Sequence, residues 1–322
     1  MPSITPRSSM SIPVSDFQER YRGALLGLAV GDAFGTTLEF CTRDQPPLHT
    51  EMLGGGAFGV APGEWTDDTA MALCLAESLI ACQGFEPHDQ MKRYVRWWQQ
   101  GEMSCQGRCI DIGNATLASL MRYQARPETP YAGSEHAYHS GNGGIMRLAP
   151  AVMVAGSLEQ AVSLAVHSSC TTHASPDCLD AAALMGSVLW RLLQGERLHD
   201  VLAEPLRQNY QGAAIHRIVE GCFKEMPRLA VSSSGYVINT LEAAFWCCWQ
   251  AGSLEEALIL AANLGDDADT VAAVTGQLAG AAFGASGIPD RWLECLAWRA
   301  DIQTKADQLL ELSGYVEVTL TL

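Results

Sequence analysis

The sequence predicts an all-α fold, built as a compact single domain of packed helices. Apolar residues recur at helical spacing in most segments of the 322-residue chain. Several of these segments begin with a serine followed by an acid or amide three residues later, or with a proline, and both patterns are typical of helix starts. Only 315–322 alternates in the manner of a β-strand. Since a single strand-like segment cannot build a sheet, we expect helices throughout.

The expected helices follow one another along the chain. The first begins at a capping box, Ser15 with Gln18, and runs to Val30. The run 271–283 near the other end carries small residues on every face, which predicts a central helix closely surrounded by others. Between these two we expect helices at 70–80, 87–99, 115–121, 148–154, 158–167, 176–193, 215–223, 237–249 and 254–262.

The composition narrows the classes of partner. The formal net charge is -16, with 20 basic residues against 36 acidic ones, which argues against a nucleic-acid surface. The eleven cysteines form no Cys-x-x-Cys pair, so we expect reduced, mostly buried thiols. No apolar run is long enough to span a bilayer, and the Ser- and Pro-rich residues 1–14 lack the apolar core of a signal peptide. We therefore expect a flexible segment at 1–14, one domain at 15–322, a cytoplasmic location and a monomer.

Two acidic motifs lie about two hundred residues apart, each directly before an apolar helical run. The segment 263–270 places three carboxylates in four positions, and the segment 64–69 places two beside threonines. A helix start favours one acid, but several so close repel one another unless a cation lies between them. Carboxylate and hydroxyl oxygens suit Mg²⁺ or Mn²⁺. If the two helix starts converge, they could hold two such ions roughly 3.5–4 Å apart through Thr66, Asp67, Asp68, Asp267, Asp269 and Thr270. Taken singly, each motif would be interpreted as a helix cap, and the pair together favours the metal site.

Two further carboxylates are candidates for proton transfer. Glu39 lies in a turn-rich segment between the apolar residues Leu38 and Phe40, which would raise its pKa if they shield it from water. A surface carboxylate is the alternative. Asp111 precedes the helix expected at 115–121, so it is either a catalytic acid or a cap of that helix.

Three other features could contact a ligand. The Gly-rich turn 141–144 precedes a helical run, and such turns let backbone N–H groups approach a phosphate. Tyr236 lies at a loop-to-helix junction, where its ring could pack or could stack on a planar ligand. His173 lies in a polar turn and is either a hydrogen-bonded structural residue or a ligand contact.

In this order, these motifs resemble the ADP-ribosylglycohydrolase family, and especially its branch of dinitrogenase reductase-activating glycohydrolases and ADP-ribosylarginine hydrolases. The resemblance covers about residues 18 to 300. It rests on 22–27 with 31–33, Trp65 to Thr69, 141–144 with Met146 and Arg147, and Asn263 to Thr270.

The resemblance implies an orthogonal helical bundle with a dinuclear Mg²⁺ or Mn²⁺ site at converging helix starts. The ligands would be Thr66, Asp67, Asp68, Asp267, Asp269 and Thr270, whereas Asp266 falls where relatives often carry Gly and is left out of the ligand set. ADP-ribose would contact Asn142, Gly143, Gly144 and Tyr236, and we count His173 with them. Glu39 matches a family carboxylate near the metals, and Asp111 matches the acid of the Asp-Ile-Gly-Asn stretch in the dinitrogenase reductase branch.

The implied activity is hydrolysis of the N-glycosidic bond at ribose C1″, which releases ADP-ribose from an ADP-ribosylated protein. Arginine is the expected attachment point, with Asp111 favoured over Glu39 as the group that moves protons. The alternatives are another linkage, such as serine or an O-acetyl ester, a metal-dependent nucleotide phosphohydrolase, and an inactive module that only binds ADP-ribose.

Overall fold

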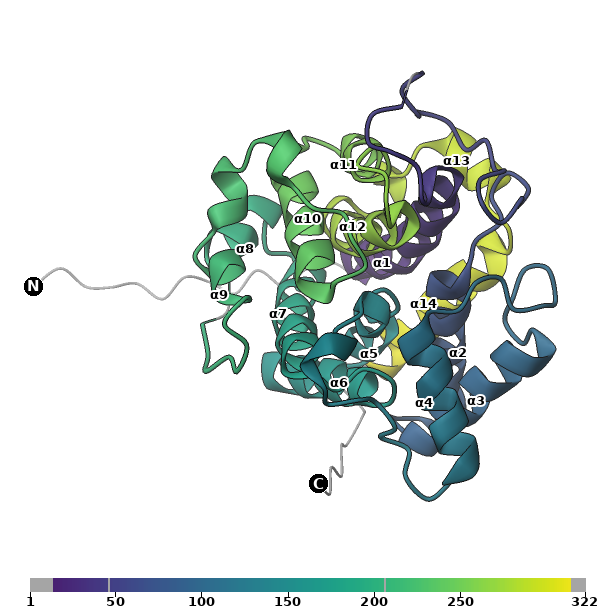
Figure 1. Cartoon of the computed structure of the whole chain (residues 1–322). Coiled ribbons are helices and arrows are strands. Elements are labelled where there is room, and N and C mark those ends of the chain that lie inside the picture. Colours follow the sequence, from purple (N-terminus) through teal and green to yellow (C-terminus); the bar gives the residue numbers. More distant parts are fainter. Residues whose placement is uncertain (1–13, 46, 206, 314–322) are drawn as a thin grey trace, which may run out of the picture.

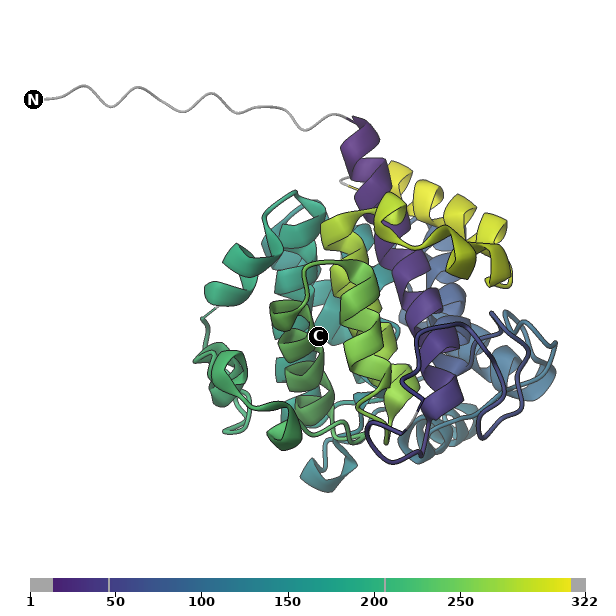
Figure 2. The same cartoon turned by 90° about the horizontal axis from the view of Figure 1, so that it is seen from above.

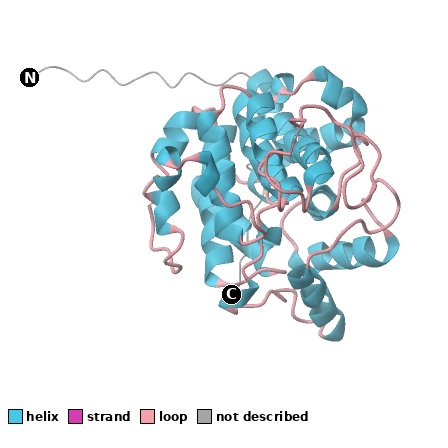
Figure 3. Cartoon of the chain, turned by 45° about the horizontal axis from the view of Figure 1, so that its top comes forward, coloured by secondary structure: helices cyan, strands magenta, loops and turns pink. Residues whose placement is uncertain are grey.

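The computed structural model describes residues 14–45, 47–205 and 207–313, and all regular elements within these ranges are helices (Figures 1 and 3). The all-α prediction is therefore confirmed for this part of the chain. The strand-like segment 315–322 and almost all of the segment 1–14 lie outside the described residues. None of the described helices is both long and apolar enough to cross a membrane. All eleven cysteines are free thiols, as expected, but only four of them are buried, so the expectation of mostly buried thiols is wrong.

Two antiparallel helices form the centre of the molecule. They are α1 (Val14–Gly35) and α12 (Ala268–Phe283), which lie side by side when seen from the front and from above (Figures 1 and 2). Glycines recur at every fourth position of α1. A Cβ atom added to Gly27 would lie 2.3 Å from the carbonyl oxygen of Gly276, and one added to Gly31 would lie 2.2 Å from that of Ala272. The two backbones are thus in direct contact, and α12 is the closely surrounded helix that its small residues predicted.

The first helix is longer than the sequence suggested. We expected it to end at Val30, but it continues through Gly31 and Asp32 to Gly35. Glycine normally weakens a helix interior. Here the missing side chains permit the close contact with α12, and that contact stabilises the last turn.

The other helices pack around this pair. The serine caps expected at Ser157, Ser175 and Ser253 are confirmed, since each hydroxyl accepts a bond from a backbone N–H of the helix that follows. In chain order the helices are α2 (Asp67–Cys82), α3 (Pro87–Gln100), α4 (Asn114–Ala125), α5 (Ala149–Met153), α6 (Leu158–Cys170), α7 (Pro176–Leu193), α8 (Leu198–Ala203), α9 (His216–Val219), α10 (Val237–Gln250), α11 (Leu254–Ala262), α13 (Asp290–Cys295) and α14 (Arg299–Leu312).

Two expected elements differ from the structure. The helix predicted at 215–223 is broken at Gly221, whose φ of 80° ends α9 before a short 3₁₀ turn at Cys222–Glu225. The Gly-rich turn does not lead directly into an α-helix. Asn142–Gly144 is itself a 3₁₀ helix, and the short α5 begins several residues later. Any phosphate contact in this region would therefore come from the turn rather than from a helix terminus.

Candidate active site

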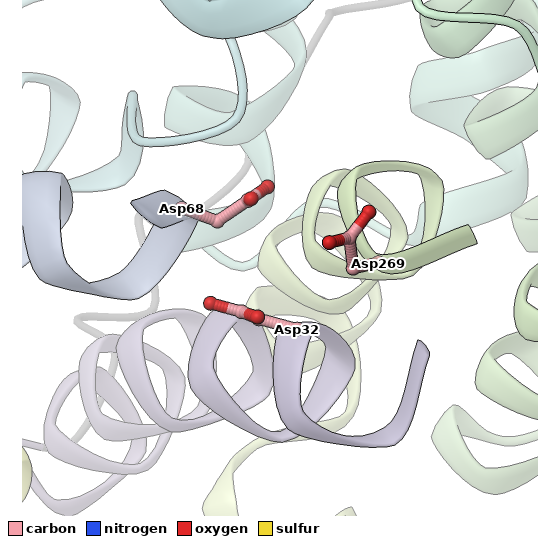
Figure 4. A group of neighbouring side chains, drawn as sticks. All are labelled: Asp32, Asp68 and Asp269. Carbon is pink, nitrogen blue, oxygen red and sulfur yellow. The ribbon is translucent and has the colours of Figure 1, made fainter. Parts of the chain in front are cut away.

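The two acidic motifs converge with the end of α1. Asp68 lies in the first turn of α2, Asp269 in the first turn of α12, and Asp32 near the end of α1, and their carboxylates point toward one another (Figure 4). One oxygen from each lies within 4.8 Å of the others. A second group, Glu39, Asp267 and Asp269, meets the same criterion. The two groups share Asp269, so they form one continuous acidic floor.

Asp32 is the residue of this floor that the sequence reasoning missed. Its carboxylate is fully buried and accepts bonds from the backbone N–H groups of Thr66 (3.0 Å) and Thr69 (2.9 Å). It also accepts bonds from both threonine hydroxyls, at 2.8 and 2.6 Å. Asp32 therefore caps α2 from a different helix and fixes the start of α2 against α1.

The side chains of the two motifs do not serve as ordinary helix caps. Thr66 precedes α2 and Asp267 precedes α12, yet neither makes a side-chain capping bond. Both carboxylate oxygens of Asp68 are buried without a hydrogen-bond partner, as is Oε2 of Glu39. Buried carboxylate oxygens without donors are costly unless a cation or a proton neutralises them. The donor set, oxygen throughout, fits a hard divalent cation.

Burial and mutual repulsion raise the proton affinity of the floor. Desolvation lifts the pKa of Asp67, Asp68 and Asp269 well above the usual value, and neighbouring carboxylates add to the effect. Desolvation likewise raises the pKa of Glu39 to about 8, opposed by a hydrogen bond with Asp269. A bound cation would reverse these shifts, because it favours the charged form of each carboxyl group.

A pocket of about 620 Å³ opens above the acidic floor. Of the residues predicted from the sequence, it is lined by Glu39, Asp67, Asp111, Asn142, Gly143, His173, Asp267 and Thr270. Thr66, Asp68 and Asp269 are buried beneath this lining. Gly144 is also buried, packed against Ser169. Tyr236 follows Gly235 of the lining and does not itself line the pocket, and its hydroxyl donates to Asp177 at 2.7 Å.

Asp111 faces the pocket and does not cap α4. The N-cap of that helix is Gly113, and Asp111 adopts a φ of 58° two residues earlier. Burial raises the pKa of Asp111, opposed by a hydrogen bond from the backbone of Ile112. Asp111 belongs to neither of the two groups with metal-ligand spacing.

The Gly-rich turn is tied to the acidic floor. The amide nitrogen of Asn142 donates to Oδ2 of Asp267 at 2.6 Å and to the hydroxyl of Thr240 at 2.9 Å. A Cβ atom added to Gly143 would lie 2.5 Å from the ring of His173. The turn thus orients one acid of the floor and leaves room for an imidazole at the pocket wall.

His173 combines the two roles considered from the sequence. Its Nδ1 is 2.8 Å from the hydroxyl of Thr172, which in turn accepts a bond from the buried Arg147. Burial, with a contribution from Arg147, lowers the pKa of His173 to about 3. The ring is therefore neutral at physiological pH, held by structural hydrogen bonds, and it lines the pocket.

A family model described as ADP-ribosylglycohydrolase matches residues 13–317. The chain belongs to the ADP-ribosylglycohydrolase family. It is 43% identical over 300 residues to the ADP-ribosylarginine hydrolase Tri1 of Pseudomonas putida, covering 93% of this chain and 80% of that protein. It is 32% identical to the ADP-ribosyl-[dinitrogen reductase] glycohydrolase of Rhodospirillum rubrum, covering 92% and 97%.

A solved structure titled ADP-ribosylglycohydrolase-related protein complex has the same fold. It superimposes with a TM-score of 0.83 at 42% identity, covering 93% of this chain and all of that one. Membership of the ADP-ribosylglycohydrolase family identifies the chain as a hydrolase of glycosidic bonds, and it agrees with a helical fold built around an acidic site that could bind metal.

Proposed function

We propose that this ADP-ribosylglycohydrolase releases ADP-ribose from arginine residues of modified proteins by hydrolysing the N-glycosidic bond at ribose C1″. The observation that carries the proposal is the acidic floor, two overlapping groups of carboxylates joined at Asp269 beneath a pocket of about 620 Å³. The similarity to a protein named ADP-ribosylarginine hydrolase supports arginine as the attachment point.

The acidic floor would hold two Mg²⁺ or Mn²⁺ ions through Thr66, Asp67, Asp68, Asp267, Asp269 and Thr270, and Asp32 and Glu39 have the spacing to join them. Bound there, such ions supply orientation of the ribose hydroxyls and a lowered pKa for a nearby water. The unpartnered oxygens of Asp68 support this assignment, because two buried acceptors without donors suit a cation ligand.

The rest of the pocket would bind the nucleotide part of the substrate. Asn142 and Gly143 would border the diphosphate, with Gly144 buried behind them and His173 as a neutral hydrogen-bonding group in the wall. Tyr236 would flank the adenosine end from just outside the lining, held in place by its bond to Asp177. These contacts fix the ribose relative to the carboxylates, and such positioning is a large part of catalysis.

Asp111 is the residue we assign to proton transfer. Breaking the bond at C1″ requires a proton for the departing nitrogen and a base for the attacking water. Glu39 has metal-ligand spacing with Asp267 and Asp269, whereas Asp111 faces the same pocket outside both groups. Asp111→Asn should lower turnover by roughly 10²–10⁴-fold while metal and ADP-ribose still bind. Unchanged turnover with intact binding would shift the role to Glu39.

The direct test measures ADP-ribose released from an arginine-ADP-ribosylated protein, with Mn²⁺ or Mg²⁺ and with a chelator, for the wild type and Asp67→Ala. We expect metal-dependent release that the variant loses. Release of free phosphate in place of intact ADP-ribose would identify a phosphohydrolase. Binding of ADP-ribose without product would identify a binding module, and release only from serine or an ester would change the linkage.

We also propose that residues 15–322 act as one domain, as a monomer and in the cytoplasm. The match of a single family model across 13–317 supports the domain assignment. Sedimentation of the purified chain at micromolar concentration would test the monomer, and a dimer would contradict it.

A further inference from the structure

Two loop residues at the mouth of the pocket have an unusual backbone conformation. Seven described residues other than glycine have a positive φ, and three of them, Phe40 (60°), Asp111 (58°) and Asp266 (59°), line this pocket. For a bulky residue such as phenylalanine this conformation is strained, and such strain concentrates at functional sites.

Phe40 and Asp266 are locked to each other through their backbones. The N–H of Phe40 donates to the carbonyl oxygen of Asp266 at 2.7 Å, and the N–H of Asp266 donates to that of Cys41 at 2.8 Å. Gly265 permits this approach, since a Cβ atom there would lie 2.5 Å from the Cys41 carbonyl. The two side chains are therefore presented from adjacent, mutually fixed loops.

Both side chains remain open to a ligand. Phe40 is 69% exposed, and its one described ring contact is an edge-on one with Phe58 at 6.2 Å. Asp266 is exposed, and none of the described ion pairs involves it. An aromatic ring held outward at a strained position adds nothing evident to the core, and an exposed acid beside it makes the pair suited to a planar cation.

The chain order places this pair beside the bond to be cleaved. Phe40 follows Glu39, and Asp266 precedes Asp267, and both of these acids belong to the acidic floor that would hold the ribose. A group attached to that ribose and leading out of the pocket passes the next residues toward the mouth. Phe40 and Asp266 both line the pocket and are both exposed, so they are the residues between these floor acids and solvent.

We propose that Phe40 and Asp266 bind the guanidinium group of the modified arginine and thereby select the arginine linkage. The inference rests on the proposed function and names the residues that recognise the leaving side of its substrate. A guanidinium is planar and positively charged, so it gains from an aromatic face and a carboxylate together. A serine linkage is neutral and gains little from either.

The test compares ligands with and without the arginine. For Asp266→Asn we expect kcat/KM for ADP-ribosylarginine to fall about tenfold, mainly through KM, with the affinity for ADP-ribose in Mn²⁺ unchanged. Asparagine tolerates the left-handed backbone as aspartate does, so the change removes charge alone. Asp44→Asn controls for the loss of a charge at a left-handed position, because Asp44 has a φ of 54°, does not line this pocket and pairs instead with Arg228.

Phe40 is tested by a pair of variants. Phe40→Leu keeps an apolar side chain without a π-face and should lower kcat/KM for ADP-ribosylarginine about fivefold, whereas Phe40→Tyr should stay close to the wild type. Unchanged kinetics in Asp266→Asn and Phe40→Leu would overturn the inference, and so would a parallel loss of ADP-ribose affinity, which indicates a purely structural role. A wild type that releases nothing from arginine would instead overturn the proposed function.

Discussion

Three acids at the floor of the pocket, Asp32, Asp68 and Asp269, lie on helices, whereas Phe40 and Asp266 at its mouth lie on loops. At the floor, the positions of Asp32 and Asp269 follow from the backbone contact between α1 and α12, and both side chains are buried. At the mouth, two backbone hydrogen bonds join the loops, and both side chains are exposed.

The floor and the mouth of the pocket therefore meet different requirements of the same site. The floor concentrates like charges in a buried place, which requires rigid helices and a counter-ion. The mouth must admit substrates attached to a protein, which requires exposed groups that contribute recognition at little cost to folding. Changes at the floor should therefore affect metal binding, stability and turnover together, and changes at the mouth should affect substrate choice alone.

The largest effect is expected for Asp269→Asn, because Asp269 belongs to both groups of the floor. Loss of a shared ligand should lower metal-dependent turnover by roughly a thousandfold. The same variant should raise the melting temperature in chelator, since it removes one of several repelling buried carboxyl groups. Turnover assays and thermal unfolding in Mn²⁺ and in chelator would measure both, with Asp301→Asn on α14 as the control. A lower melting temperature in chelator would contradict the account.

The next largest effect concerns the backbone contact between α1 and α12, which positions Asp32 and Asp269 in the acidic floor. An alanine replacing glycine inside a helix normally stabilises it. In Gly31→Ala, however, the new Cβ atom would lie 2.2 Å from the Ala272 carbonyl oxygen and 2.9 Å from the backbone nitrogen of Ala273. We expect a loss of about 1–3 kcal/mol in the free energy of unfolding and weaker Mn²⁺ binding, as α1 and α12 separate.

Chemical denaturation and Mn²⁺ titration would measure both quantities for Gly31→Ala. Gly252→Ala, in the turn before α11, is the control for the same exchange without a backbone clash, because a Cβ atom there would meet only the end of the Glu256 side chain, at 3.4 Å. A Gly31→Ala variant as stable as the wild type would show that the helices tolerate separation.

Much of the floor could be predicted because its residues are neighbours in the sequence. Asp67 and Asp68, or Asp267 and Asp269, stand at helix starts, and both the helix and its excess of acid are visible in the chain. Asp32 was not predicted because the first helix was expected to end at Val30, which leaves Asp32 outside it, whereas the helix continues to Gly35. The signal available in the sequence was a single acid, Asp32, within an apolar stretch in which glycine recurs at every fourth position.

The mouth could not be predicted in the same way. Its arrangement depends on hydrogen bonds between residues more than two hundred positions apart, and on backbone angles that composition does not reveal. The φ of 59° at Asp266 is one that glycine adopts without strain, and the sequence alone does not show that Asp266 has it. The same applies to Tyr236, whose place beside rather than within the pocket lining depends on the bond to Asp177.

A smaller effect should follow from Asn142→Ala, because the Asn142 side chain links the Gly-rich turn to the acidic floor. Asn142 donates to Asp267 without having a metal-ligand spacing of its own. Loss of such a supporting bond typically lowers metal affinity about 10–100-fold. Mn²⁺ titration of the variant would measure the change, and recovery of kcat when both Mn²⁺ and substrate are saturating would confirm that Asn142 positions the metal ligand Asp267. An unchanged Mn²⁺ affinity would exclude it.

The effect that is smallest per unit change is the dependence of folding stability on pH, and the sign of its slope should differ between the metal-free and the metal-bound floor. Burial raises the pKa of Glu39 from 4.5 to about 8, so the folded chain binds this proton more tightly than the unfolded chain. Without metal, stability should therefore fall as pH rises from about 4.5 to about 8, by up to about 1.4 kcal/mol per pH unit for each such carboxyl group. Saturating Mn²⁺ should remove or reverse the slope, because a cation competes with the protons.

Glu39→Gln should make the slope in chelator shallower, because it removes one of these titrating groups. Melting temperatures measured between about pH 4.5 and pH 8 would test this expectation. A metal-free protein whose stability rises with pH would contradict it, because the carboxyl groups of the floor would then already be ionised.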